Sequence, residues 1–82
     1  MDNLKVFRIE WLDGAKAWFV DYNDDDALTH YLEEVGRVHD EPDVDAVYRE
    51  DEDATIETDD GFMTVEEILD DCDEPMLIAE DK

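Results

Sequence analysis

Apolar and polar side chains alternate in two runs at the start of the chain, residues 4–12 and residues 15–22. A period of two residues is typical of a β-strand with one buried face. Asp13-Gly14 separates the two runs and is a strong hairpin signal, because a type I′ turn requires positive φ at both central positions. The sequence therefore predicts an N-terminal β-hairpin, and both of its faces carry apolar side chains.

A helical period follows the hairpin. Asn23 and the acids after it suit a helix N-terminus, since their side chains cap free N–H groups and negative charge is favourable at that end. Gly36 suits the residue that ends a helix, and Pro42 prevents regular pairing in residues 37–43. The apolar positions recur at i, i+3, i+4 and i+7, which predicts one buried stripe. This stripe consists of Leu28, Tyr31, Leu32 and Val35.

The second half of the chain predicts two strands, a helix and a last strand. Residues 44–49 alternate, and residues 54–58 form a shorter strand centred on an isoleucine; each run is followed by an acidic turn. Residues 64–67 (Thr-Val-Glu-Glu) have the spacing of a capping box, so a helix is expected to begin there. Pro75 ends that helix, and residues 76–79 form a short strand. The helix has its apolar stripe at Val65, Ile68, Leu69 and Cys72.

These elements give the order ββαββαβ. We expect an α+β fold with an antiparallel or mixed sheet and two amphipathic helices packed on one face. The chain has 82 residues, which predicts a single acidic domain over residues 1–82. Hydrophobic residues make up 43% of the chain, so a folded core is favoured over disorder despite the high charge.

The net charge of the chain is extreme. Asp and Glu number 28 against six Lys and Arg, which gives a formal charge of −22. Such a field repels nucleic acid and anionic membranes and attracts basic proteins and cations. We therefore expect no direct binding to nucleic acid or membrane. Neighbouring carboxylates repel each other within a screening length of about 8 Å at physiological salt, which lowers stability.

Carboxylates are densest between residues 50 and 81, where no Lys or Arg occurs. We predict that they pair with Arg and Lys of a basic partner, because carboxylate–guanidinium pairs provide geometry as well as charge. A second candidate patch lies at the start of the first helix. The predicted partner-binding residues are Glu50, Asp51, Glu52, Asp53, Asp59, Asp60, Glu66, Glu67, Asp70 and Asp71, with Asp24, Asp25 and Asp26 in the second patch.

Metal binding and catalysis are not indicated. Asp21, Asn23 and Asp25 match the first ligands of an EF-hand loop, but Asp26 stands where Gly is required and Leu32 where the bidentate Glu is required. The many carboxylates single out no acid–base pair, and no nucleotide-binding or zinc motif occurs. We expect no metal site, no cofactor, no catalytic residue and no enzymatic activity.

The histidines and aromatic residues have structural interpretations. His30 and His39 follow no metal-ligand spacing, so both are interpreted as solvated surface residues. Most aromatic side chains lie at core spacing. Because the hairpin has apolar residues on both faces, one of Trp11, Trp18 and Phe19 is a candidate to remain exposed as an interface anchor.

Cellular location is predicted from cysteine usage and from the lack of apolar segments. Cys72 is the only cysteine and is expected to be a buried, inert thiol, which fits a reducing compartment. Residues 1–5 lack the pattern of a signal peptide, and no apolar run approaches the roughly 20 residues that span a bilayer. We therefore expect a soluble protein in the cytoplasm.

Three explanations of the acidity remain open. The first is mimicry of nucleic acid, because a duplex carries one charge per about 1.7 Å and its binding proteins match it with Lys and Arg. The second is adaptation to high salt, which an excess of Asp over Glu and the scarcity of Lys also fit. The third is an adaptor that binds a basic protein without competing with nucleic acid.

The chain resembles the small acidic inhibitors that phages and mobile elements encode, among them anti-CRISPR, anti-restriction and glycosylase-inhibitor proteins that act as DNA mimics. The resemblance is of class and rests on size, charge and acid-lined helices at residues 23–34 and 64–71. It implies a stoichiometric, non-enzymatic inhibitor in the host cytoplasm. For the anti-CRISPR class it implies binding to a basic nucleic-acid-binding effector complex at its target-DNA or PAM site.

Overall fold

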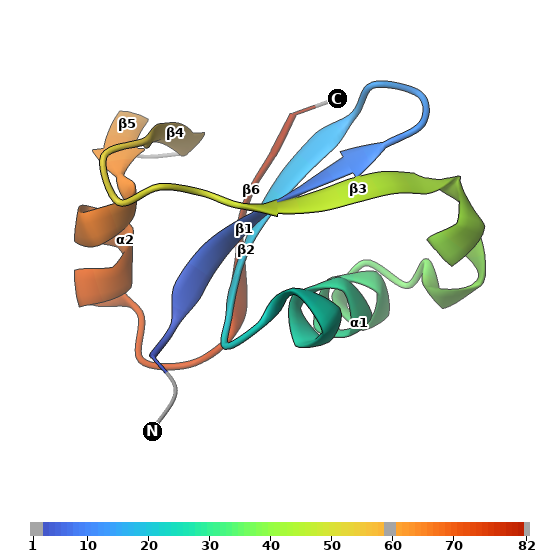
Figure 1. The fold of residues 1–82 in the computed structure, drawn as a ribbon, viewed down its shortest axis with the longest axis horizontal. Helices are drawn as coiled ribbons and strands as arrows, with labels where there is room; N and C mark the ends of the chain where they lie inside the picture. Colours follow the sequence, from blue (N-terminus) through green and yellow to red (C-terminus); the bar gives the residue numbers. More distant parts are fainter. Residues whose placement is uncertain (1–2, 59–60, 82) are drawn as a thin grey trace.

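A four-stranded antiparallel sheet lies at the centre of the molecule, with the strand order β3-β1-β2-β6. The computed structural model describes residues 3–58 and 61–81. In Figure 1 the sheet runs between two outer layers, with α2 on one side and α1 on the other. The strands are β1 (Lys5–Trp11), β2 (Lys16–Asp21), β3 (Val44–Arg49) and β6 (Met76–Asp81).

The predicted N-terminal hairpin is present, and its turn differs from the expected one. β1 and β2 pair in register with Phe7 opposite Phe19. The Trp11 N–H donates to the Ala15 carbonyl at 2.9 Å, which leaves three residues in the loop. Gly14 has φ of +93° and no other residue of the loop has positive φ. The turn is therefore a three-residue loop with Gly at its positive-φ position, and not the two-residue type I′ turn.

The first outer layer consists of α1 (Asp24–Glu34) and the 3-10 helix η1 (Val38–Asp43). The Asn23 side chain caps α1 by accepting from the Asp26 N–H at 2.8 Å, as its position predicted. The apolar stripe of α1 packs on the face of the sheet that carries the odd-numbered residues of the hairpin. This core consists of Phe7, Ile9, Trp11, Ala17, Phe19, Ala27, Tyr31 and Leu32.

The second outer layer consists of α2 (Val65–Asp71) and the hairpin β4 (Thr55–Thr58) and β5 (Gly61–Thr64). The capping box at the start of α2 is confirmed, with both of its hydrogen bonds formed between Thr64 and Glu67. This layer covers the even-numbered face of the hairpin. The second core consists of Val6, Val20, Ile56, Val65 and Ile68.

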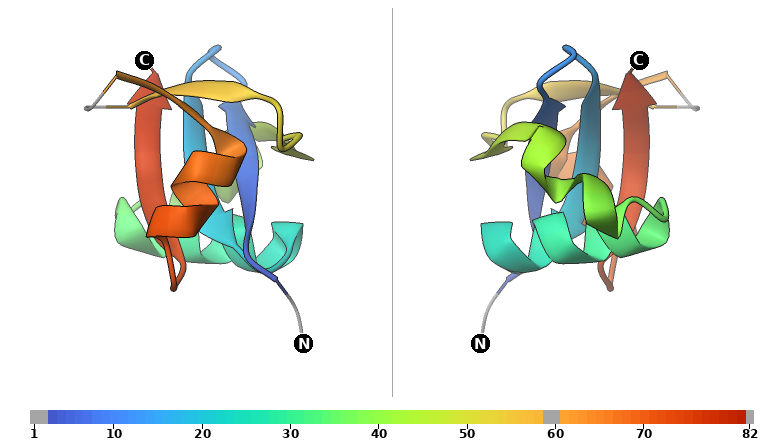
Figure 2. Two further views of the ribbon diagram at one scale, coloured as in Figure 1. Left: turned by 90° about the vertical axis from the view of Figure 1, so that its left-hand side faces the viewer. Right: turned by 90° about the vertical axis from the view of Figure 1, so that its right-hand side faces the viewer.

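The fold prediction was wrong in element order and in the placement of the helices. The observed order is β-β-α-η-β-β-β-α-β, with β5 between a predicted turn and a predicted helix cap and with η1 in a segment assigned to a connection. The two views of Figure 2 show α2 in front of the sheet from one side and α1 with η1 in front of it from the other. Because Phe7 and Val6 belong to different cores, the sheet has two apolar faces, and each must be covered.

Across the described residues, no helix combines the length and the apolar character that crossing a membrane requires.

Candidate functional site

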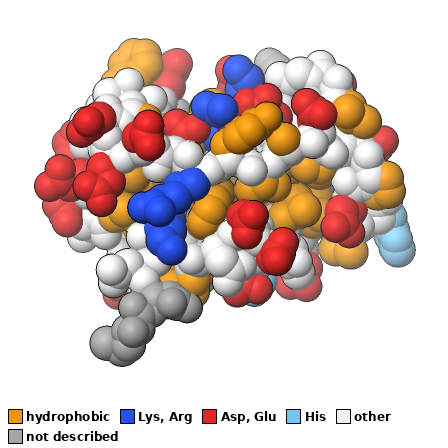
Figure 3. All heavy atoms as spheres, in the orientation of Figure 1, with side chains coloured by type: hydrophobic (Ala, Val, Ile, Leu, Met, Phe, Trp, Pro, Cys, Tyr) orange, Lys and Arg blue, Asp and Glu red, His pale blue; other side chains and the backbone are white. Residues whose placement is uncertain are grey.

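The predicted acidic residues of the second half gather at one end of the molecule. The Val65 N–H at the start of α2 donates to the Ala54 carbonyl at 3.0 Å, which holds the loop between β3 and β4 against this helix. Glu50 and Glu52 of the loop line a small cleft together with Leu69 of α2. In Figure 3 acidic side chains cluster on the left, where Figure 1 shows α2 and this loop.

Glu50 differs from its acidic neighbours because it belongs to an internal ion-pair network. Its carboxylate lies 2.7 Å from Arg8 Nη1, and its side chain is only 11% exposed. Arg8 Nε lies 2.8 Å from the Glu10 carboxylate, without the angle of a hydrogen bond, and the guanidinium lies over the Tyr48 ring. Glu50 therefore neutralises a cation of its own chain, and we leave it out of the candidate interface.

Glu67 also has an intramolecular role. Its carboxylate accepts from the Thr64 N–H at 3.2 Å and from the Thr64 hydroxyl at 3.1 Å. The other acids of this region are exposed and form no ion pair with the described residues. We call this group the acidic end, and it consists of Asp51, Glu52, Asp53, Glu66, Asp70 and Asp71. The predicted residues Asp59 and Asp60 lie outside the described residues.

The second predicted patch is separated from the acidic end. Asp24, Asp25 and Asp26 form the first turn of α1, in the other outer layer. Lys5 and Arg49 line the cleft that holds Glu50 and Glu52, and they also line the cleft that holds Asn23 and Asp24. Figure 3 shows basic side chains between acidic groups on this face. The predicted surface is therefore two patches divided by two cations.

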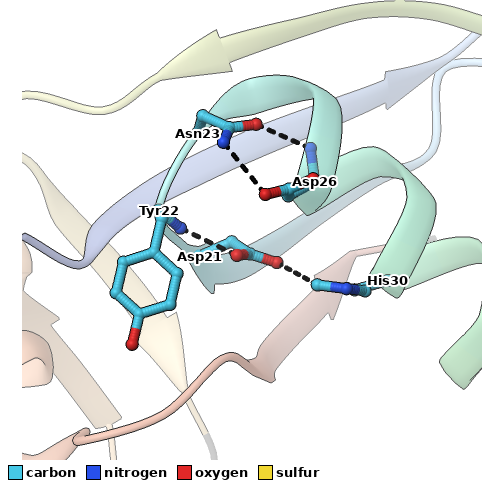
Figure 4. Close-up of polar contacts among 5 residues, drawn as sticks. All are labelled: Asp21, Tyr22, Asn23, Asp26 and His30. Atoms are coloured by element: carbon cyan, nitrogen blue, oxygen red, sulfur yellow. Dashed lines mark hydrogen bonds and ion pairs between the residues drawn. The ribbon is translucent and has the colours of Figure 1, made fainter. Parts of the chain in front are cut away.

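Asp21 is a buried carboxylate, and its sequence context had suggested only a position in the rejected EF-hand loop. It lies at the end of β2, is 0% exposed, and accepts from the Tyr22 N–H at 2.8 Å. Its other oxygen contacts His30 Nδ1 from α1, as Figure 4 shows. The hydrogen bond to Asp21 is the main cause that raises the pKa of His30, and the charges of Asp26 and Glu33 raise it further. His30 is half-exposed and is not the free surface histidine that was predicted.

The sequence did contain a signal for this pair. Ala17, Phe19 and Asp21 alternate on one face of β2, so the period that buries Phe19 also buries an acid. A buried carboxylate requires hydrogen-bond partners, because an unpaired charge is very unfavourable in the core. His30 follows the buried Ala27 of α1 by three positions, which places it on a neighbouring part of the helix surface.

Cys72 and His39 are the other side chains that the sequence analysis considered for chemistry. The Cys72 thiol is part-buried, and burial is the main cause that raises its pKa, with Asp71 and Asp73 adding to the effect. A raised pKa keeps the thiol protonated and weakly nucleophilic. His39 is exposed on η1. No group of His, Cys, Asp and Glu within the described part of the chain has an arrangement that could hold a metal ion.

Two of the three aromatic residues proposed as anchors are buried. Trp11 and Phe19 are 4% and 3% exposed, and Trp11 Nε1 donates to the Tyr31 hydroxyl at 3.1 Å. The Arg37 guanidinium covers the Trp11 ring at 3.9 Å from the ring centroid. Trp18 is part-buried and lines an open cleft beside β4 and β6. Of the three predicted anchors, Trp18 is therefore the one that a partner can reach, although Phe62 and Tyr48 are more exposed.

Comparisons with protein-family models, with curated proteins and with solved structures give no match for this chain.

Proposed function

We propose that this protein is a non-enzymatic inhibitor that mimics nucleic acid and occupies the basic DNA-binding surface of a defence complex in the host cytoplasm, with a CRISPR effector as the favoured target. The observation that carries the proposal is the acidic end. Six exposed carboxylates from α2 and the β3–β4 loop lie together there, and none forms an ion pair with the described residues. Such a surface complements Arg and Lys that otherwise hold phosphates.

The position of Asp70 and Asp71 supports a functional role for the charge. Both lie in the last turn of α2, which contains no basic residue. Negative charge at a helix C-terminus opposes the helix dipole, by about 0.3–1 kcal/mol for an exposed group at low salt. Asp70 and Asp71 therefore lower the stability of the fold, and a role in binding a basic partner would explain their presence.

Adaptation to high salt is the alternative, and the distribution of acids favours it in one respect. Exposed acids also occur on the opposite layer, in α1 and η1. A protein adapted to salt needs acids on all faces, whereas a mimic needs them on the side that meets its target. An adaptor that binds a basic protein without competing with DNA would also use the acidic end.

The first experiment is capture of partners by the tagged protein from a bacterial lysate that contains CRISPR and restriction systems, at about 0.15 M salt. We expect a nucleic-acid-binding complex to be retained and to be released by added duplex DNA. Retention of a basic protein that duplex DNA does not displace would support the adaptor instead. Retention of no basic protein by the folded domain would contradict mimicry.

A charge-reversal variant tests whether the acidic end is the contact surface. Changing Glu66, Asp70 and Asp71 to Lys should abolish capture of the DNA-displaceable complex. The same change should not destabilise the fold, because two of the new cations lie at the C-terminus of α2 and offset the unfavourable cation that Glu66→Lys places in its first turn. Glu67 is left unchanged because it caps the helix. Loss of capture with unchanged or higher stability cannot be attributed to unfolding.

The matched control changes Glu34, Glu41 and Asp45 to Lys, which gives the same net charge on the opposite layer and the edge strand. These three residues are exposed and form no ion pair with the described residues. We expect the control to retain at least half of the capture. Equal loss in both variants would show that total charge matters and that the acidic end is not a specific surface.

A further inference from the structure

A cleft between β4 and β6 combines an aromatic side chain with carboxylates. Its volume is about 380 Å³, and it is lined by Trp18 of β2, by the whole of β4 and by the end of β6. Glu57, Glu80 and Asp81 belong to this lining and are exposed. Among the residues that the structure describes, no Lys, Arg or His lines the cleft. The cleft therefore presents negative charge beside an accessible indole.

The chain itself binds guanidinium groups in this kind of environment. Arg37 lies 3.9 Å from the centroid of the Trp11 ring, and its Nε donates to Asp40 at 2.9 Å. Arg8 lies 5.0 Å from the centroid of the Tyr48 ring and pairs with two glutamates. In both places an aromatic ring and a carboxylate contact the same cation. The cleft beside Trp18 offers the same two components.

Two cations of the hairpin lie near this cleft, but neither belongs to its lining. Arg8 is directly opposite Trp18 in the β1–β2 register, but its glutamate partners hold it in the ion-pair network described above. Lys16 is opposite Asp81 in the β2–β6 register and on the same face of the sheet, but it forms no ion pair with Asp81 and is not part of the cleft lining. Glu80 also lines the separate cleft beside Trp11, so Glu57 and Asp81 are the carboxylates particular to the Trp18 cleft.

We propose that this cleft binds a single Arg or Lys side chain of the basic partner, with Trp18 providing a cation–π contact and Glu57 and Asp81 providing charge. The inference rests on the proposed function and names an anchor point for it outside the acidic end. The cleft has a volume of about 380 Å³, which is enough to admit one Arg or Lys side chain.

The test is a titration with N-acetyl-arginine amide, followed by the indole N–H signals of the two tryptophans in NMR spectra. A Trp18→Phe variant assigns the signals, and Trp11 serves as the internal reference because its N–H is bonded to Tyr31 and its ring is covered. We expect the Trp18 signal to shift in a saturable manner while the Trp11 signal stays in place. N-acetyl-citrulline amide, which has the same shape without the charge, should shift neither signal.

Two variants with equal net charge separate a site from general attraction. Changing Glu57 to Gln and Asp81 to Asn should weaken arginine amide binding about three- to tenfold, as expected for two exposed charge contacts. Changing Asp51 to Asn and Glu52 to Gln at the acidic end should alter it less than about twofold. Equal weakening in both variants, or an equal shift of both indole signals, would overturn the proposal.

The titration with arginine amide tests the Trp18 cleft separately from the capture experiment, which tests mimicry. If arginine amide leaves the Trp18 signal unchanged while duplex DNA still displaces a captured complex, the cleft is not an anchor and mimicry stands. If the Trp18 signal shifts as expected and no basic complex is captured, the cleft is a guanidinium site and the mimic proposal fails.

Discussion

The buried carboxylate of Asp21 connects strand β2 to helix α1 through its contact with His30. Asp21 is fully buried at the end of β2, and His30 approaches it from the exposed side of α1. The contact links the sheet to the helix at the position where the chain turns from one to the other (Figure 4). The strength of this link depends on the protonation of His30, because both the hydrogen bond to Asp21 and the charge of Asp21 favour the protonated imidazole.

The stability of the fold should therefore depend on pH through His30. Its folded-state pKa is raised above 6.5, chiefly by the bond to Asp21, so the stabilisation is complete below the unfolded-state pKa. It is lost as the pH rises through the folded-state pKa. We expect the difference in unfolding free energy between wild type and His30→Gln to be larger at about pH 5.5 than at about pH 8.5.

Chemical unfolding at both pH values measures that difference. His39→Gln is the control, because His39 is exposed on η1 and forms no ion pair with the described residues. A difference for His30→Gln that stays constant with pH would show that the charge on His30 contributes nothing to folding.

Tyr31 allows a second test at the scale of one residue. Its hydroxyl accepts from Trp11 Nε1 at 3.1 Å, and the side chain is 2% exposed. Tyr31→Phe should leave a buried N–H without a partner and lower the unfolding free energy by about 1–3 kcal/mol. Urea unfolding followed by circular dichroism provides the measurement. Tyr48→Phe, which changes an exposed tyrosine, should stay within about 0.5 kcal/mol of wild type.

At the scale of elements, the stability of the short helix α2 comes from its N-terminal cap and from its packing against the sheet. It has seven residues, too few to be stable alone, and its last turn carries acids. Val65 and Ile68 bury it against the sheet, and the capping box satisfies the free N–H groups at its start. The acidic end therefore has fixed positions only because the cap and the second core hold this helix in place.

Removing the cap should show how much it contributes. Thr64→Ala loses the hydroxyl that accepts from the Glu67 N–H at 3.2 Å, which should lower the unfolding free energy by about 1 kcal/mol. Hydrogen exchange should also become faster at the first amides of α2. The control is Thr29→Ala on the exposed surface of α1, where alanine is the better helix former. A Thr64→Ala variant as stable as the control would mean that packing alone positions α2.

The whole molecule has to fold against its own charge. With −22 on 82 residues, the repulsion is distributed over both outer layers, and the few described ion pairs cancel little of it. The two cores oppose this repulsion, one under α1 and one under α2. Two small cores on opposite faces of one sheet offer more buried surface than a sheet covered on one side, which suits a short chain.

Salt should stabilise the fold. The salt concentration at which the protein folds distinguishes nucleic-acid mimicry from adaptation to high salt. Raising sodium chloride from about 0.1 M to about 1 M shortens the screening length from about 10 Å to about 3 Å, which should raise the urea midpoint. Under the mimic proposal, circular dichroism shows a folded protein at the lower salt. An unfolded chain at about 0.1 M that folds only near molar salt would favour salt adaptation.

Neutralising all six residues of the acidic end with Asn and Gln provides the control for the salt series. This variant should have a weaker dependence of the urea midpoint on salt, because six repelling charges are removed. An unchanged dependence would place the dominant repulsion elsewhere on the molecule.

Local features of this protein were determined by its sequence alone. Alternation predicted β1 and β2, Asn23 and Thr64 marked the starts of both helices, and the charge follows directly from the composition. These features depend on neighbours within a few positions, so periodicity and capping chemistry are sufficient to predict them. β5 was missed because the four residues from Gly61 to Thr64 are too few to show a period beside a turn and a cap.

Only the tertiary structure decided which carboxylates are free to contact a partner and on which side of the sheet they lie. Glu50 and Asp51 are adjacent in sequence, yet Glu50 pairs with Arg8 of a distant strand while Asp51 is exposed. The sheet also separates α1 from α2, so the acids at their starts belong to different layers (Figure 2). Pairing across 42 positions and the choice of sheet face depend on contacts between segments far apart in the chain, which no local pattern encodes.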